Sequence, residues 1–144
     1  MIEQDTIKLL RECDAGIKMG TSSIEDVLDD VHSEDMRNCL AECRNDHVKL
    51  QDEVQALLDR FHDDGKEPSF LAETMSRMKT DAKMMMERSD ATIADLMTDG
   101  CNMGVKSLSR YLNQYKAADE NSKDITKRLI GLEEGLAVQI RPYL

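Results

Sequence analysis

The fold is decided by the stretch of residues 33–61, which reads SEDMRNCLAECRNDHVKLQDEVQALLDRF. Its apolar residues recur at alternating spacings of four and three residues, which is the pattern of a helix that buries one face. The members of this stripe are Met36, Leu40, Cys43, His47, Leu50, Val54, Leu57 and Phe61. Charged and amide side chains fill most of the positions between them. The stretch therefore predicts a long amphipathic helix packed against other helices, with His47 as an ionisable group in its buried face.

The same alternation continues on both sides of this stretch. It predicts an all-α chain with helices over residues 4–31, 33–62, 69–87, 89–117 and 121–141. Ser33 and Ser89 are suitable N-caps, and the polar residues 119–122 precede the last helix. Asp63, Asp64 and Gly65 are typical of a helix end.

The first predicted helix contains Gly16 and Gly20, each of which costs about 1 kcal/mol relative to alanine in a helix interior. Residues 22–25 also fit a capping box that could begin a new helix there. The apolar stripe continues through both glycines, which favours one continuous helix. A short connection to the next helix predicts that the first two helices run antiparallel.

The length, composition and net charge of the chain exclude several classes of fold and of binding partner. A chain of 144 residues suits a single domain spanning 1–144, and its few prolines and aromatic residues argue against sandwiches and barrels. The net charge of −10 disfavours nucleic-acid binding and anionic membrane surfaces. No apolar run approaches the ~20 residues of a membrane span, and the acidic N-terminus does not fit a signal peptide. We therefore expect a cytoplasmic protein whose four cysteines are core thiols.

Two segments carry a resemblance to a known family. The run LLRECDAG at 9–16, and the stretch from MSRMK at 75–79 to Asp99-Gly100, resemble uncharacterised bacterial ferritin-like bundles. This resemblance implies an antiparallel four-helix bundle with a shorter helical segment between helices two and three. In the catalytic members of that superfamily, inward carboxylates and two Glu-x-x-His pairs hold two irons.

The di-iron ligand pattern is not present in this chain. The residue three positions before His47 is Arg44, and neither Glu133 nor Glu134 is followed three residues later by histidine. The acidic residues Asp95 and Asp99 lie off the apolar stripe of their predicted helix. What remains on the inward faces is His47, together with Asp14 from the first predicted helix.

Three interpretations of these two residues stay open. Asp14 and His47 could form a buried hydrogen bond, because buried polar groups are normally paired. His47 and Asp14, with Glu42 or Glu134, could instead hold a single metal ion. In the third interpretation the helix register differs and His47 lies at the edge of the core.

The sequence therefore predicts a non-catalytic structural or interaction module, forming a homodimer and needing no cofactor. The alternative is a metal-binding oxidoreductase or iron-handling protein that uses iron or manganese at an atypical site around His47. A further alternative is an adaptor whose methionine-rich segment, residues 70–86, binds a helix of a protein partner.

Overall fold

A computed structural model describes residues 2–68 and 89–144 of the chain. The described part contains the helices α1 (Ile2–Leu28), α2 (Glu34–Arg60), α4 (Asp90–Gln114) and α5 (Glu120–Gln139), followed by the short 3-10 helix η1 (Arg141–Tyr143). It contains no strand, so the all-α prediction is confirmed for these residues. The predicted helix over 69–87 and the methionine-rich segment over 70–86 lie outside the described residues.

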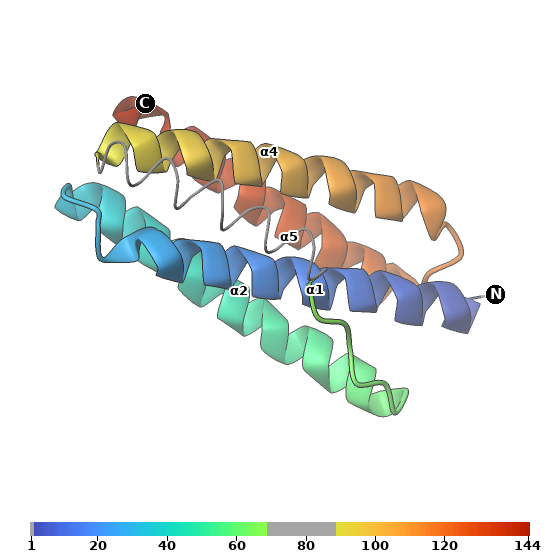
Figure 1. Ribbon diagram of the computed structural model, residues 1–144. Coiled ribbons are helices and arrows are strands. Elements are labelled where there is room, and N and C mark those ends of the chain that lie inside the picture. The colour runs from blue at the N-terminus through green and yellow to red at the C-terminus, as the bar shows by residue number, and fades with distance from the viewer. Residues whose placement is uncertain (1, 69–88) are drawn as a thin grey trace.

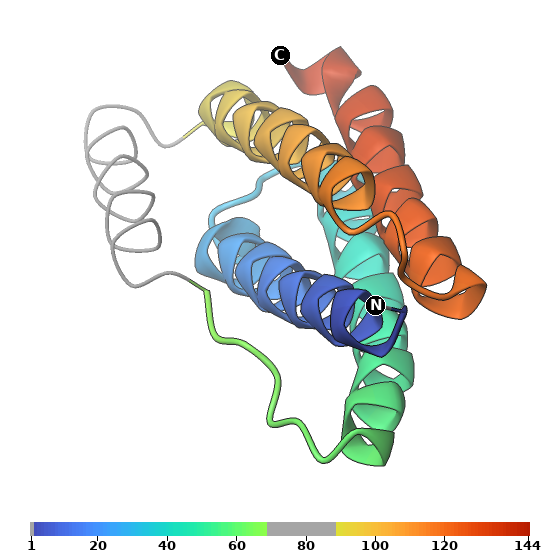
Figure 2. The same cartoon turned by 90° about the vertical axis from the view of Figure 1, so that its right-hand side faces the viewer.

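The four long helices form a bundle made of two hairpins. Figure 1 shows the chain reversing direction between α1 and α2, and again between α4 and α5. Figure 2 shows the same helices roughly end-on, grouped around a shared interior. Helix α1 packs against α2, α4 and α5, and α2 also packs against α5. Helix α1 is therefore in contact with each of the other three long helices.

The predicted N-caps Ser33 and Ser89 are confirmed. Ser33, Ser89 and Asp119 are the N-caps of α2, α4 and α5, and each side chain accepts a hydrogen bond from a backbone N–H in the first turn. Helix α1 is continuous through Gly16 and Gly20, as its stripe predicts, although it ends at Leu28 rather than at residue 31.

The buried apolar residues form two clusters, one toward each end of the bundle. One cluster includes Ile24, Met36, Leu40, Ile93 and Leu136; the other includes Leu10, Ile17, Leu50, Val54 and Leu129. On α2, Cys43 belongs to the first cluster and Leu50 to the second. His47 lies between them, so this buried polar residue separates the two apolar clusters.

Residues 61–68 leave the end of α2 and run back beside α1 (Figures 1 and 2). Two left-handed residues shape this connection, His62 at φ 54° and Gly65 at φ 83°. At the other end of the bundle, the Asp90 carboxylate accepts hydrogen bonds from the backbone N–H groups of His32 and Ser33 at 2.7 and 2.8 Å. This contact ties the turn of the first hairpin to the start of α4.

No helix within residues 2–68 and 89–144 combines the length and the apolar character that crossing a membrane requires.

Candidate functional site

The centre of the bundle holds an ion pair between His47 of α2 and Glu133 of α5. The His47 side chain is 1% exposed, and its Nε2 donates to Glu133 Oε1 at 3.1 Å. Its Nδ1 lies 2.8 Å from the backbone oxygen of Cys43, which can only accept. Because both ring nitrogens act as donors in this geometry, the imidazole is protonated and positively charged.

The environment of His47 stabilises this charge. Burial alone would lower the pKa of the imidazole, because desolvation disfavours the charged form. Hydrogen bonds to the Cys43 thiol, the Glu133 carboxylate and the Cys43 carbonyl outweigh burial and raise the pKa of His47 to about 10. His47 is therefore a cation at neutral pH, and Glu133 is its counter-ion.

Two glycines border this ion pair. A Cβ atom added at Gly20 of α1 would lie 3.0 Å from His47 Nε2, and one at Gly104 of α4 would lie 3.5 Å from Glu133 Cδ. The first distance is tighter than ordinary van der Waals contact, so even alanine at position 20 would press on the imidazole. Because glycines stand at these two positions, space is left between α1 and α4 next to the ion pair.

That space belongs to a cavity of about 350 Å³, which we call the α1–α4 groove. His47, Glu133 and Leu136 contribute to its lining from α2 and α5, and the rest of its lining comes mainly from α1 and α4. Its apolar lining includes Met19, Met97 and Met103, and Met103 is 69% exposed. Methionine side chains adapt to ligands of different shape. The groove thus combines an apolar lining with a buried ion pair, as ligand sites commonly do.

The groove has a polar lining at both ends. At one end lie Glu12 of α1, Lys66 of the connection and Tyr111 of α4. At the other end lie Ser22, Ser23 and Asp26 of α1. Lys66 Nζ contacts Glu12 Oε1 at 2.5 Å, and this hydrogen bond raises the pKa of Lys66. Burial and the nearby Glu12 carboxylate raise the pKa of the Tyr111 hydroxyl.

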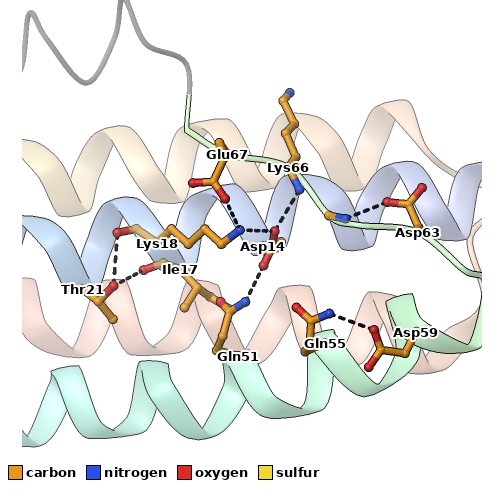
Figure 3. Close-up of polar contacts among 11 residues, drawn as sticks. Asp14, Ile17, Lys18, Thr21, Gln51, Gln55, Asp59, Asp63, Lys66 and Glu67 are labelled. Atoms are coloured by element: carbon orange, nitrogen blue, oxygen red, sulfur yellow. Dashed lines mark hydrogen bonds and ion pairs between the residues drawn. The ribbon is translucent and has the colours of Figure 1, made fainter.

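A second polar cluster surrounds Asp14, which is fully buried (Figure 3). Its Oδ2 accepts hydrogen bonds from Lys18 Nζ and from the backbone N–H of Lys66, both at 2.9 Å. Its Oδ1 accepts a hydrogen bond from Gln51 Nε2. Lys18 also contacts Glu67 Oε1 at 2.7 Å. Asp14 therefore joins α1, α2 and the connection 61–68 at one point.

The structure gives Asp14 and His47 different partners, so the predicted hydrogen bond between them is replaced by two separate contacts. Asp14 pairs with Lys18 and Gln51, whereas His47 pairs with Glu133. The helices are antiparallel as expected, but the carboxylate that faces His47 comes from α5 rather than from α1.

The other predicted metal-site residues lie apart from this pair. Glu42 borders a separate cavity of about 250 Å³ between α2 and α5, together with Cys39, Cys43 and Asp46. Glu134 is exposed on α5. Within the described ranges, no group of three or more His, Cys, Asp or Glu side chains is arranged to hold a metal ion.

Cys101, near Glu133, and Cys13, in the other half of the bundle, are buried thiols. Burial, followed by the charge of Glu133, raises the pKa of Cys101 far above its usual range. Cys13 on α1 has a pKa raised by burial to about 11 and contacts the Thr126 hydroxyl at 3.2 Å. A thiol needs a lowered pKa to act as a nucleophile near neutral pH, so these two cysteines pack in the core.

Glu133 is the site residue that the sequence reasoning missed. From the sequence alone, Glu133 is tested only as the first residue of a Glu-x-x-His pair and not as an inward-facing residue of the last helix. Yet Glu133 follows the buried Leu129 by four residues and precedes the buried Leu136 by three. The helical spacing alone could have placed it on the inward face of the last helix.

The chain matches no protein-family model, no curated protein and no solved structure.

Proposed function

We propose that this chain is a non-catalytic binding module of the ferritin-like type, in which the α1–α4 groove takes a ligand with a single apolar chain. The observation that carries the proposal is the groove itself. It has a volume of about 350 Å³, it is bordered by methionine side chains and by glycines, and it has polar groups at its ends and at the ion pair. Ligand pockets are mostly apolar clefts of roughly 300–1,000 Å³ with few polar groups.

The dimensions of the groove favour an extended chain. The lining follows α1 from Glu12 to Asp26, which is a length of about 21 Å at a rise of 1.5 Å per residue. An extended alkyl chain can lie along this length against the apolar lining.

The geometry of His47 supports binding without a metal. Imidazole ligates a metal through a nitrogen that carries no proton. In His47 one nitrogen donates to the Cys43 carbonyl and the other to the Glu133 carboxylate. A metal at this position would therefore have to displace a proton from a buried ion pair, which opposes the alternative of an iron or manganese site.

The order of the helices supports the ferritin-like type. Two hairpins joined by one long connection, here residues 61–89, is the arrangement of ferritin-like bundles. All four cysteines are free thiols, which supports a reducing compartment such as the cytoplasm. We also keep the homodimer as a prediction, which sedimentation velocity at several protein concentrations would test.

Binding of decanol, followed by isothermal titration calorimetry, tests the groove. We expect saturable binding at one equivalent, abolished by Gly104→Leu because the added side chain enters the groove beside Glu133. The matched control is Gly131→Leu on α5, where an added Cβ meets no atom within 4 Å. Binding that survives Gly104→Leu, or that is lost in both variants, would overturn the proposed binding site.

Elemental analysis tests the metal alternative. For protein produced with added iron and manganese, we expect metal well below one equivalent per chain. A full equivalent that disappears in His47→Leu, but persists in the surface variant Glu134→Gln, would replace the proposal with a metal site at His47.

A further inference from the structure

The connection 61–68 builds one end of the groove, and its position is fixed from within the bundle. Lys66 and Pro68 belong to the groove lining although neither is part of a helix. The backbone N–H of Lys66 donates to the buried Asp14 carboxylate, which is also held by Lys18 and Gln51. A Cβ atom at the preceding Gly65 would overlap Asp14 Oδ2, so the connection lies directly against α1.

The groups at this end form a balanced charge pair. The Lys66 ammonium and the Glu12 carboxylate are 2.5 Å apart, and their side chains are 41% and 14% exposed. Tyr111 adds a hydroxyl group from α4, and its pKa is raised by burial and then by the charge of Glu12. Together these three side chains offer donors and acceptors with no net charge at neutral pH.

We infer that the Glu12–Lys66 pair is the head-group site of the groove and selects an uncharged polar head, such as an alcohol, on an apolar chain. This inference rests on the proposed function, because it names the ligand class of the same groove. An ammonium head would face a carboxylate already neutralised by Lys66, and a carboxylate head would face an ammonium already neutralised by Glu12. A hydroxyl group can donate to Glu12 and accept from Lys66 while leaving the ion pair in place.

Asp14 acts as a positioning residue for this site. It does not border the groove, but it holds the backbone of Lys66 and thereby places the ammonium group beside Glu12. The Lys18 ammonium contacts both Asp14 and Glu67. It therefore neutralises the buried Asp14 carboxylate next to the connection 61–68.

Charge removal on either side of the pair gives a direct test, with decanol, decylamine and decanoate as probes in calorimetric titrations. We expect the unaltered protein to bind decanol most tightly. Lys66→Met leaves Glu12 uncompensated, so the preference should move to decylamine by about tenfold or more. Glu12→Gln leaves Lys66 uncompensated and should move the preference to decanoate by a similar factor.

Lys49→Met is the matched control, since Lys49 is an exposed lysine of α2 outside the groove. Lys49→Met should bind the three probes in the same order of affinity as the unaltered protein. The inference is overturned if Lys66→Met and Glu12→Gln show the same order of affinities as this control. If the unaltered protein binds none of the three probes, both the proposed function and this inference fail. If it binds decanol but the order of affinities is the same in all variants, only the inference fails.

The positioning role of Asp14 has its own readout. In the Glu12→Gln background, Asp14→Asn should reduce the preference for decanoate over decanol, because the backbone N–H of Lys66 no longer has a charged acceptor. The affinity for decanol itself should stay within about twofold. A general loss of stability would weaken both probes alike. An unchanged decanoate preference, or an equal loss for both probes, would overturn the role assigned to Asp14.

Discussion

His47 is a buried cation because a backbone carbonyl and a carboxylate both accept hydrogen bonds from its ring, and these contacts raise the pKa of the imidazole. Removing the carboxylate alone leaves a charge in the core without a counter-ion. We expect Glu133→Leu to lower the free energy of unfolding by about 3–5 kcal/mol, whereas the double variant His47→Leu/Glu133→Leu recovers most of this loss. Urea denaturation would measure both.

Glu134→Leu provides the control for this prediction, because Glu134 is the exposed neighbour of Glu133 on the same helix. Its effect should stay within about 0.5 kcal/mol. A double variant that is no more stable than Glu133→Leu would show that the cost of Glu133→Leu does not come from an uncompensated charge on His47.

The same pair predicts how stability depends on pH. The pKa of His47 is raised from the ordinary value of 6.5 to about 10 in the folded chain, so folding favours the protonated form. The stabilisation is complete below about pH 6.5 and declines as the pH rises, until it is lost above about pH 10. Urea midpoints measured from pH 6 to pH 10 should therefore fall, and His47→Leu/Glu133→Leu should show a distinctly smaller fall over that range. Parallel pH dependence in the two proteins would contradict the assignment.

At the scale of the elements, the connection 61–68 depends on glycine at position 65. Gly65 has φ 83°, where other residues are strained, and a Cβ there would overlap the Asp14 carboxylate. We expect Gly65→Ala to cost about 2–4 kcal/mol, from backbone strain and from the displaced hydrogen bonds of Asp14. Thermal unfolding followed by circular dichroism would measure the change.

The contrasting substitution is Gly135→Ala in the exposed face of α5, where an added Cβ meets no atom within 4 Å. It should raise stability by about 0.5–1 kcal/mol through helix propensity alone. If Gly65→Ala is as harmless as Gly135→Ala, the connection is not fixed against Asp14 as the structure indicates.

The sequence predicts the elements well because their signals are local. Helix periodicity and the caps at Ser33, Ser89 and Asp119 depend on residues within a few positions of one another, and all three caps form. The inward positions of Asp14 and His47 also follow from the stripes. The partners of these two residues depend on how helices distant in sequence pack, and on a connection with two left-handed residues. No pattern within one helix specifies Gln51, Lys66 or Glu133 as those partners.

At the scale of the whole molecule, the two polar clusters meet the same groove. The His47–Glu133 pair contributes directly to its lining, and the Asp14 cluster fixes the connection that forms one of its ends. The apolar clusters on either side of His47 hold the helices together without these groups. The head-group residues Glu12, Lys66 and Tyr111 belong to neither apolar cluster. Variants at the head-group site can therefore test binding without removing contacts of the core.

The net charge of −10 gives a prediction for the molecule as a whole. Folding brings an excess of carboxylates close together, and this repulsion extends over roughly 30 Å at 0.01 M salt but only about 8 Å at 0.15 M. Salt also weakens exposed ion pairs such as Arg128–Glu53, which lowers stability, but each pair contributes only about 0–1 kcal/mol. We therefore expect sodium chloride over this range to raise the free energy of unfolding by on the order of 1 kcal/mol. Chloride is the suitable anion, because sulfate would strengthen apolar burial by itself. Urea midpoints that fall with added chloride would mean that surface ion pairs outweigh the repulsion among the surplus carboxylates.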